Sequence, residues 1–174
     1  MSPRHDRSLP MPVTVLTRRL ASAALATLIL AAFSSTLVAA QSAGAGVLTL
    51  PSSHDFATTT AQLQDAIAEE GLVLVTTIDH AANAENAGLD LLPTMVFVFG
   101  NPQAGTPLMQ AARTIALDLP QKMLVWEDEA GDVFVTWRDP TVLATHHGLT
   151  RDHGPLPNIA ALLESLAQTA AGSP

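Results

Sequence analysis

The stretch from Thr94 to Phe99 constrains the fold most, because it is apolar at nearly every position and leads directly into Gly100. A strand with one solvated face alternates apolar and polar residues, whereas a strand buried on both faces is a continuous apolar run. Pro93 precedes the stretch, and proline is accepted at the first position of a strand. The sequence therefore predicts a central strand with other segments around it.

Segments with the periodicity of helices and strands lie on both sides of this run. Phe56, Thr60, Leu63 and Ile67 share one helical face, and Asp55 stands at the N-cap position. Further strands are expected over 47–50, 72–78, 122–127 and 133–137, and further helices over 81–87, 107–113, 140–147 and from 157 or 158 to about 169. This order of elements predicts an α+β fold with helices on one side of a sheet.

The loop after the central strand has the Gly100 to Gly105 spacing that opens a phosphate-binding P-loop. The lysine that such a loop needs is absent, and Pro107 removes a backbone donor. The sequence thus argues against a nucleotide site. It predicts a turn, followed by a helix that Thr106 caps and Pro107 begins. A helix N-terminus can bind an anion without lysine, so a weaker anion site stays open beside the purely structural turn.

The first forty residues have the pattern of a secretory signal. Arg18 and Arg19 precede an apolar, alanine-rich run from Leu20 to Ala40, and small residues stand at Val38 and Ala40 before Gln41. We expect a signal peptide over 1–40, a linker over 41–46, one domain over 47–170 and a tail over 171–174, with Met11 as an alternative start. The protein is then periplasmic or secreted. The alternative is an uncleaved anchor, because residues 20–40 are long enough to span a bilayer.

Charge and cysteine content limit the partners of the exported part. Residues 41–174 hold four basic residues against fifteen carboxylates, which gives a net charge of −11. Such a surface repels nucleic acid and anionic lipid headgroups, so we expect neither as a partner. The chain contains no cysteine, which excludes disulfides and thiol chemistry. Its stability must therefore come from its core or from oligomerisation.

Histidines are the main candidates for chemistry. Asp79 and His80 follow a predicted strand, where His80 could act as a general base oriented by the Asp79 carboxylate, or both could act as metal ligands. The alternative is a helix cap by Asp79, with His80 bonded to a carbonyl. His146, His147 and His153 could bind copper, nickel or zinc, but they lack a strict ligand spacing. The simpler interpretation of His146 and His147 is two exposed histidines at a helix C-terminus, where positive charge is mildly favoured. We therefore predict no metal site and no cofactor.

Many short pieces, in their order and spacing, resemble the domain of unknown function 302 family over roughly Val47 to Leu149. They are Phe56 with Thr60 and Leu63, Ile78-Asp79-His80, Ala87-Gly88-Leu89, Leu92-Pro93, Phe99 to Pro102, Gly105 to Met109, Asp118-Leu119-Pro120, Val125 to Asp128, Gly131 and Asp139-Pro140. The resemblance implies a curved antiparallel sheet backed by helices, similar to a β-α-β-β-β-β-α repeat of the TATA-binding-protein fold. It also suggests homodimers, and it implies no activity.

The leading functional hypothesis is an exported, non-enzymatic domain that binds an unknown small molecule or protein. We expect its ligand-binding cleft to be lined by His80, Asn101, Thr106 and Met109, because they follow two neighbouring strands. One alternative is a small periplasmic enzyme or metal-binding protein that uses His80 as general base or ligand. Another is a structural, dimeric partner domain without a ligand.

Overall fold

The computed structural model describes residues 41–42 and 46–172 of the 174-residue chain. The predicted signal peptide and its membrane-anchor alternative lie outside these residues, as do the last two residues of the expected tail. Within the described ranges, no helix combines the length and the apolar character that crossing a membrane requires.

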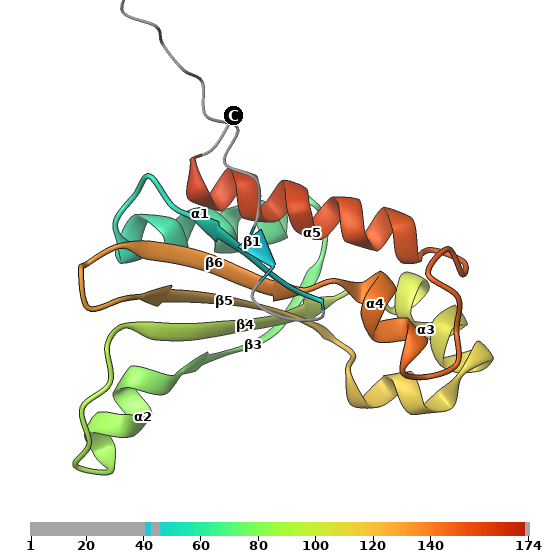
Figure 1. The fold of residues 1–174 in the computed structure, drawn as a ribbon, viewed down its shortest axis with the longest axis horizontal. Helices are drawn as coiled ribbons and strands as arrows, with labels where there is room; N and C mark the ends of the chain where they lie inside the picture. The colour runs from blue at the N-terminus through green and yellow to red at the C-terminus, as the bar shows by residue number, and fades with distance from the viewer. Residues whose placement is uncertain (1–40, 43–45, 173–174) are drawn as a thin grey trace, which may run out of the picture. The chain divides into compact units, whose positions relative to one another are not determined.

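Six strands form one antiparallel sheet in the order β1-β2-β6-β5-β4-β3 (Figure 1). They are β1 (Gln41–Ser42), β2 (Val47–Pro51), β3 (Val73–Asp79), β4 (Thr94–Gly100), β5 (Gln121–Glu127) and β6 (Val133–Arg138). Because β4 lies between β3 and β5, its predicted position inside the sheet is confirmed. β1 pairs with β2, so the first two residues of the expected linker belong to the sheet.

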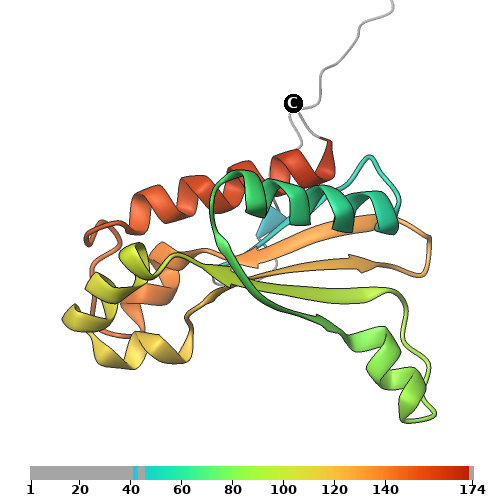
Figure 2. The ribbon, with the colours of Figure 1, turned by 180° about the vertical axis from the view of Figure 1, so that it is seen from behind.

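Five α-helices and one 3-10 helix, η1, connect and cover these strands. They are α1 (Phe56–Glu69), α2 (His80–Asn86), α3 (Pro102–Ala111), η1 (Arg113–Leu117), α4 (Pro140–Thr145) and α5 (Leu156–Ala171). α1 and α5 lie side by side over one face of the sheet, as both views show (Figures 1 and 2). With β2 beside β6, the path β2-α1-β3-β4-β5-β6-α5 has the strand order of the expected repeat, and the α+β fold is confirmed.

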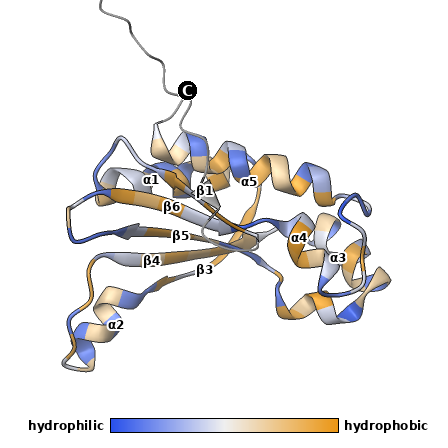
Figure 3. Cartoon of the chain, in the orientation of Figure 1, coloured by the Kyte–Doolittle hydropathy of each residue, from blue (hydrophilic) through white to orange (hydrophobic). Residues whose placement is uncertain are grey.

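The core fills the space between the sheet and these two helices. Alternate strand residues point into it, as the period of two requires. The fully buried large side chains include Phe97, Phe99, Met123, Val125 and Val135 from the sheet and Leu63, Ile67, Leu163 and Leu166 from the helices. Figure 3 shows apolar residues on the sides of α1 and α5 that face the strands.

Two details of the helices differ from the sequence prediction. Thr59, and not Thr60, is the buried threonine of α1. Its hydroxyl donates to the Asp55 carbonyl at 2.8 Å and contacts Ser52 Oγ at 2.8 Å, so burial leaves it hydrogen-bonded. At the other end of the chain, Ala171 is fully buried and still helical. The helix therefore continues into the segment expected to be a frayed tail.

The opposite face of the sheet has no helix over its centre, and we call it the uncovered face. In Figure 1, α2 lies at one end of this face, and η1 and α3 lie at the other. The strand register identifies the residues of the uncovered face, because they alternate along each strand with the buried core residues. Its centre consists of Thr49, Ile78, Thr94, Val96, Val98, Leu124, Trp126, Phe134 and Thr136.

Large side chains on the uncovered face shield one another. Trp126 and Phe134 stack with ring centroids 4.7 Å apart, and Trp126 Nε1 donates to Thr136 Oγ1 at 2.9 Å. Val98 is buried and Val96 is half-buried on this face. The apolar run of β4 therefore has two causes, a helix-covered core on one side and a self-packed sheet surface on the other.

α3 begins five residues earlier than the sequence predicted. Asn101 is its N-cap and accepts from the Gln103 N–H at 2.9 Å, and Pro102 is the first helical residue. Thr106 and Pro107 lie inside the helix, so Thr106 is not a cap. Gly100 and Asn101 also need no left-handed backbone, since Asn101 has φ −128° and Gly100 is not among the positive-φ glycines. Two cap-then-proline patterns occur in succession, and the first one determines the helix start.

This position of the cap can be tested by two alanine substitutions. Asn101→Ala should lower the free energy of unfolding by about 1 kcal/mol, because it removes a side-chain cap. Thr106→Ala should leave it within about 0.5 kcal/mol, because an exposed helix interior accepts alanine readily. Urea denaturation of both variants measures the difference. A larger loss for Thr106→Ala would contradict the helix start at Pro102.

Candidate functional site

The four residues expected to line one cleft are divided between two ends of the sheet. β3 and β4 are antiparallel, with Asp79 opposite Met95 and Val73 opposite Gly100. His80 therefore follows β3 at one end, and Asn101 follows β4 at the other, about 20 Å away along the strands. Figure 1 shows α2 and α3 at these opposite ends. The structure does not bring His80 together with the other three, because the expected convergence requires parallel strands.

The local surroundings of these residues have structural explanations. Asp79 caps α2 by accepting from the Ala82 N–H at 2.9 Å, and His80 is the exposed first residue of that helix. Asn101 and Thr106 are exposed on α3, whereas Met109 is half-buried. Met109 packs against a second, smaller core made of Leu108, Ile115, Ala144 and Leu156. A ligand-binding role for His80, Asn101, Thr106 and Met109 stays a prediction.

His147 forms a contact that the sequence did not reveal. Its Nε2 lies 2.6 Å from Asp118 Oδ2, and its Nδ1 lies 3.0 Å from Thr114 Oγ1. The His147 side chain is only 9% exposed and that of Asp118 is 29% exposed. The interpretation of His147 as an exposed histidine is therefore wrong. In the part of the chain that the structure describes, no three His, Asp or Glu side chains are grouped to hold a metal.

The contact joins segments that are far apart in the sequence. Asp118 follows η1 and His147 follows α4, with the whole β5–β6 hairpin between them. The hydroxyl of Thr114, the imidazole and the carboxylate thus form one chain that fixes η1 against the end of α4. The sequence signals for this place were His147, considered as a metal ligand, and Asp118-Leu119-Pro120, one of the pieces that carried the family resemblance.

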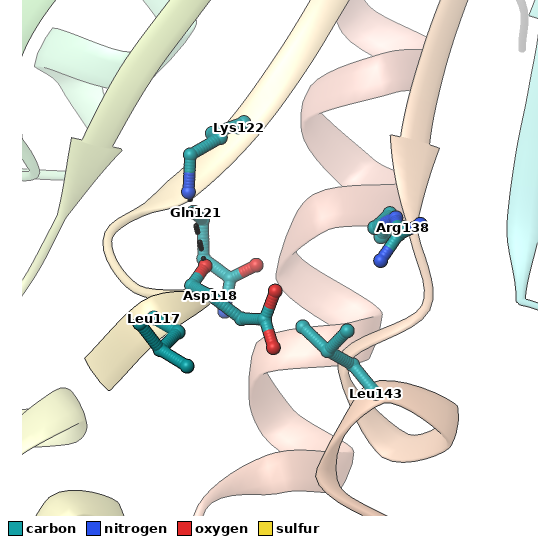
Figure 4. Close-up of a pocket in the computed structure, with 6 residues that line it drawn as sticks. All are labelled: Leu117, Asp118, Gln121, Lys122, Arg138 and Leu143. Atoms are coloured by element: carbon teal, nitrogen blue, oxygen red, sulfur yellow. Dashed lines mark hydrogen bonds between the residues drawn. The ribbon is translucent and has the colours of Figure 1, made fainter. Parts of the chain in front are cut away.

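A pocket of about 220 Å³ opens beside this contact (Figure 4). We call it the Arg138 pocket, and its lining residues are Leu117, Asp118, Gln121, Lys122, Arg138 and Leu143. Lys122 Nζ donates to the carbonyls of Asp118 at 3.1 Å and Pro120 at 2.9 Å. Figure 4 shows Lys122 and Arg138 on opposite sides of the pocket, with the Asp118 carboxylate between η1 and Leu143. These residues come from η1 and the position directly after it, and from β5, β6 and α4.

The sequence model of the family described as "Domain of unknown function DUF302" matches residues 48–170. The chain belongs to the DUF302 family. The match extends through most of α5 and so beyond the region in which the resemblance was recognised. A solved structure with this fold is described as "Crystal structure of uncharacterized conserved protein DUF302 from Bacillus stearothermophilus". It has a TM-score of 0.64 and 18% sequence identity, and the similarity covers 73% of this chain and 99% of that one.

Curated relatives with higher identity are longer proteins. The chain is 46% identical over 104 residues to "Fluoride-specific ion channel FluC 1" of Brucella suis, and also to "Fluoride-specific ion channel FluC 2" of Brucella melitensis. The match covers 60% of this chain but only 41% and 38% of those proteins. This DUF302 chain therefore spans about two fifths of the length of the curated relatives it matches.

Proposed function

We propose that this DUF302 protein is an exported binding domain whose partner is a second copy of itself. The uncovered face of the sheet carries this proposal. Its centre is apolar or threonine-lined, and its large side chains, Leu124, Trp126 and Phe134, are only half-buried. A contiguous exposed apolar area of this kind is typical of protein interaction surfaces.

The charge distribution supports a self-association at this place. Residues 41–174 carry a net charge of −11, so two copies repel each other over most of their surface. The uncovered-face positions of β2 to β6 contain no aspartate or glutamate. The charged residues of this face are Lys122 and Arg138, which lie at its η1 end, so two copies can meet at its centre without like-charge repulsion. Most homo-oligomers use such a self-complementary patch about a twofold axis.

The size of the face fits a reversible dimer. Five strands spaced at about 4.8 Å, with about six residues each at 3.4 Å, make a surface of roughly 24 by 20 Å. Two copies would bury roughly 1,000 Å² in total, which lies at the lower end of specific interfaces. A dimer that dissociates at micromolar concentration is therefore expected.

The proposal is tested by measuring mass in solution over a range of about 1 to 100 μM. The unmodified protein should change from monomer to dimer in that range. Leu124→Glu places a charge at the centre of the face and should weaken the dimer at least about tenfold. Gln64→Glu adds the same charge on the exposed side of α1 and should have no effect. A wild-type protein that stays monomeric throughout would overturn the proposal.

The relatives and the N-terminal sequence support the rest of the proposal. In the curated fluoride-channel proteins, the matching region is part of a longer chain, which is consistent with a domain that works next to another protein part. The basic and apolar pattern of residues 18–40 supports export. N-terminal sequencing of the protein recovered outside the cytoplasm should begin at Gln41. A protein that retains residues 20–40 in the membrane fraction would favour the anchored alternative.

A further inference from the structure

We propose that the Arg138 pocket binds a small organic carboxylate that also carries a hydrogen-bond donor, such as an α-amino or α-hydroxy acid. This inference does not depend on the homodimer, because the pocket lies at the end of the uncovered face and is complete within one copy.

The two cations of the pocket are unusual in this chain. Residues 41–174 contain four basic side chains, and two of them, Lys122 and Arg138, line this single pocket. The hairpin register places Met123 opposite Trp137, so Lys122 and Arg138 occupy the next facing position of β5 and β6. Like charges at facing positions of neighbouring strands are destabilising. An anion between them would remove this repulsion.

The guanidinium of Arg138 is available for such an anion. Among residues 41–42 and 46–172, Arg138 forms no salt bridge, although the chain has an excess of carboxylates. Arg138 is also exposed at the pocket rim. Its planar donors suit the two oxygens of a carboxylate. Lys122 is held in place by its two backbone acceptors and adds a positive charge from the other side.

The Asp118 carboxylate determines which group the ligand needs besides its own carboxylate. Its Oδ2 is taken by His147 at 2.6 Å, whereas its Oδ1 accepts no hydrogen bond within the described part of the chain. A simple anion would meet this carboxylate as a like charge. A ligand that also has an ammonium or hydroxyl group can donate to Oδ1 while its own carboxylate binds Arg138. The charges of the pocket therefore favour a carboxylate that also carries a hydrogen-bond donor over a plain anion.

The remaining walls suit a short apolar side chain. Leu143 is buried and closes one side of the pocket, whereas Leu117 is 82% exposed at its mouth. A leucine so exposed gains by being covered when a ligand with an aliphatic group is bound. At about 220 Å³ the pocket has room for several water-sized groups, which matches a small acid. Because the charged groups are open to solvent, we expect a dissociation constant of about 0.1 to 10 mM.

The test is an NMR titration of the isotope-labelled protein with four probes: L-alanine, L-lactate, acetate and L-alaninamide. L-alanine and L-lactate should shift the backbone amides of Lys122 and Arg138. They should also bind at least about fivefold more tightly than acetate, which lacks the donor, or L-alaninamide, which lacks the carboxylate. Equal binding of acetate would overturn the requirement for a hydrogen-bond donor on the ligand. Absence of any shift up to about 50 mM of all four probes would overturn the site.

Variants separate the site from general charge effects. Arg138→Met keeps the aliphatic stem and should weaken L-alanine binding at least about tenfold. Arg151→Met removes an exposed arginine elsewhere and should not change it. Gln121→Ala is a second substitution in the pocket wall, and it leaves the net charge of the protein unchanged. Unchanged L-alanine binding in Arg138→Met, in a protein whose spectrum shows an intact fold, would overturn the proposal.

Discussion

Phe97→Ala should lower the free energy of unfolding by about 3 to 5 kcal/mol, the largest loss expected from any single change considered for this protein. Phe97 is 1% exposed and lies in the middle of β4, between the sheet and the two covering helices. Its removal loses the transfer free energy of an aromatic ring and leaves a cavity that the neighbouring core residues cannot fill. Urea denaturation, with the slope of the transition checked for constancy, measures the loss.

Phe134→Ala is the matched control for this prediction. Phe134 is the same residue type in the same sheet, but it lies half-buried on the uncovered face, stacked on Trp126. Its removal should cost about 1 to 2 kcal/mol, because the ring is already partly in water. Both variants should be measured at low protein concentration, so that association does not contribute. Equal losses for the two would contradict the assignment of the main core to the helix-covered face of the sheet.

Asp118→Ala should lower the free energy of unfolding by about 1 to 3 kcal/mol, the second-largest effect expected. The substitution leaves His147 Nε2 without its partner in a side chain that is 9% exposed, and an unsatisfied buried polar group costs about that much. The cost should appear as a lower denaturation midpoint. Asp90→Ala removes an exposed carboxylate from a loop and should change stability by less than about 0.5 kcal/mol.

A double-mutant cycle identifies the cause of this loss. If the contact between Asp118 and His147 is responsible, Asp118→Ala should cost much less in a His147→Ala background than in the wild type. Additive losses would show that the two side chains act independently, and the link between η1 and α4 would then lie elsewhere. The cycle also separates the structural part of Asp118 from its proposed part in the Arg138 pocket, which the ligand titrations measure.

Local patterns predicted most elements of the fold. Asp55 specifies the start of α1, because its side chain caps the helix. The β-branched run of β3 specifies a strand, because its side chains favour extended backbone. The strands expected over 122–127 and 133–137 form the β5–β6 hairpin for the same reason, since a turn between two apolar runs is a local signal. α3 shows where local signals fail. Both Asn101-Pro102 and Thr106-Pro107 are adequate helix starts, and their sequence does not rank them.

The residues of the candidate site also form two groups: some are placed by local patterns, and others are placed only by the packing of distant segments. The facing positions of Lys122 and Arg138 follow from the local hairpin register, although the expected strand over 133–137 ended before Arg138 and neither residue was a predicted site residue. The contact of His147 with Asp118 does not follow, because it depends on how α4 and η1 pack after an intervening hairpin. Neither residue has a local pattern that predicts its partner.

By itself, the sequence determined the kinds of elements, their order, the family resemblance and the acidic, cysteine-free surface. Only the tertiary structure decided which ends of the strands meet. β3 and β4 run antiparallel, so His80 and Asn101 lie apart, while Asp118, Lys122, Arg138 and His147 come from four separate segments to one place. The physical reason is that capping and periodicity act within a few residues. Strand direction and helix docking are instead fixed by the burial of the whole core.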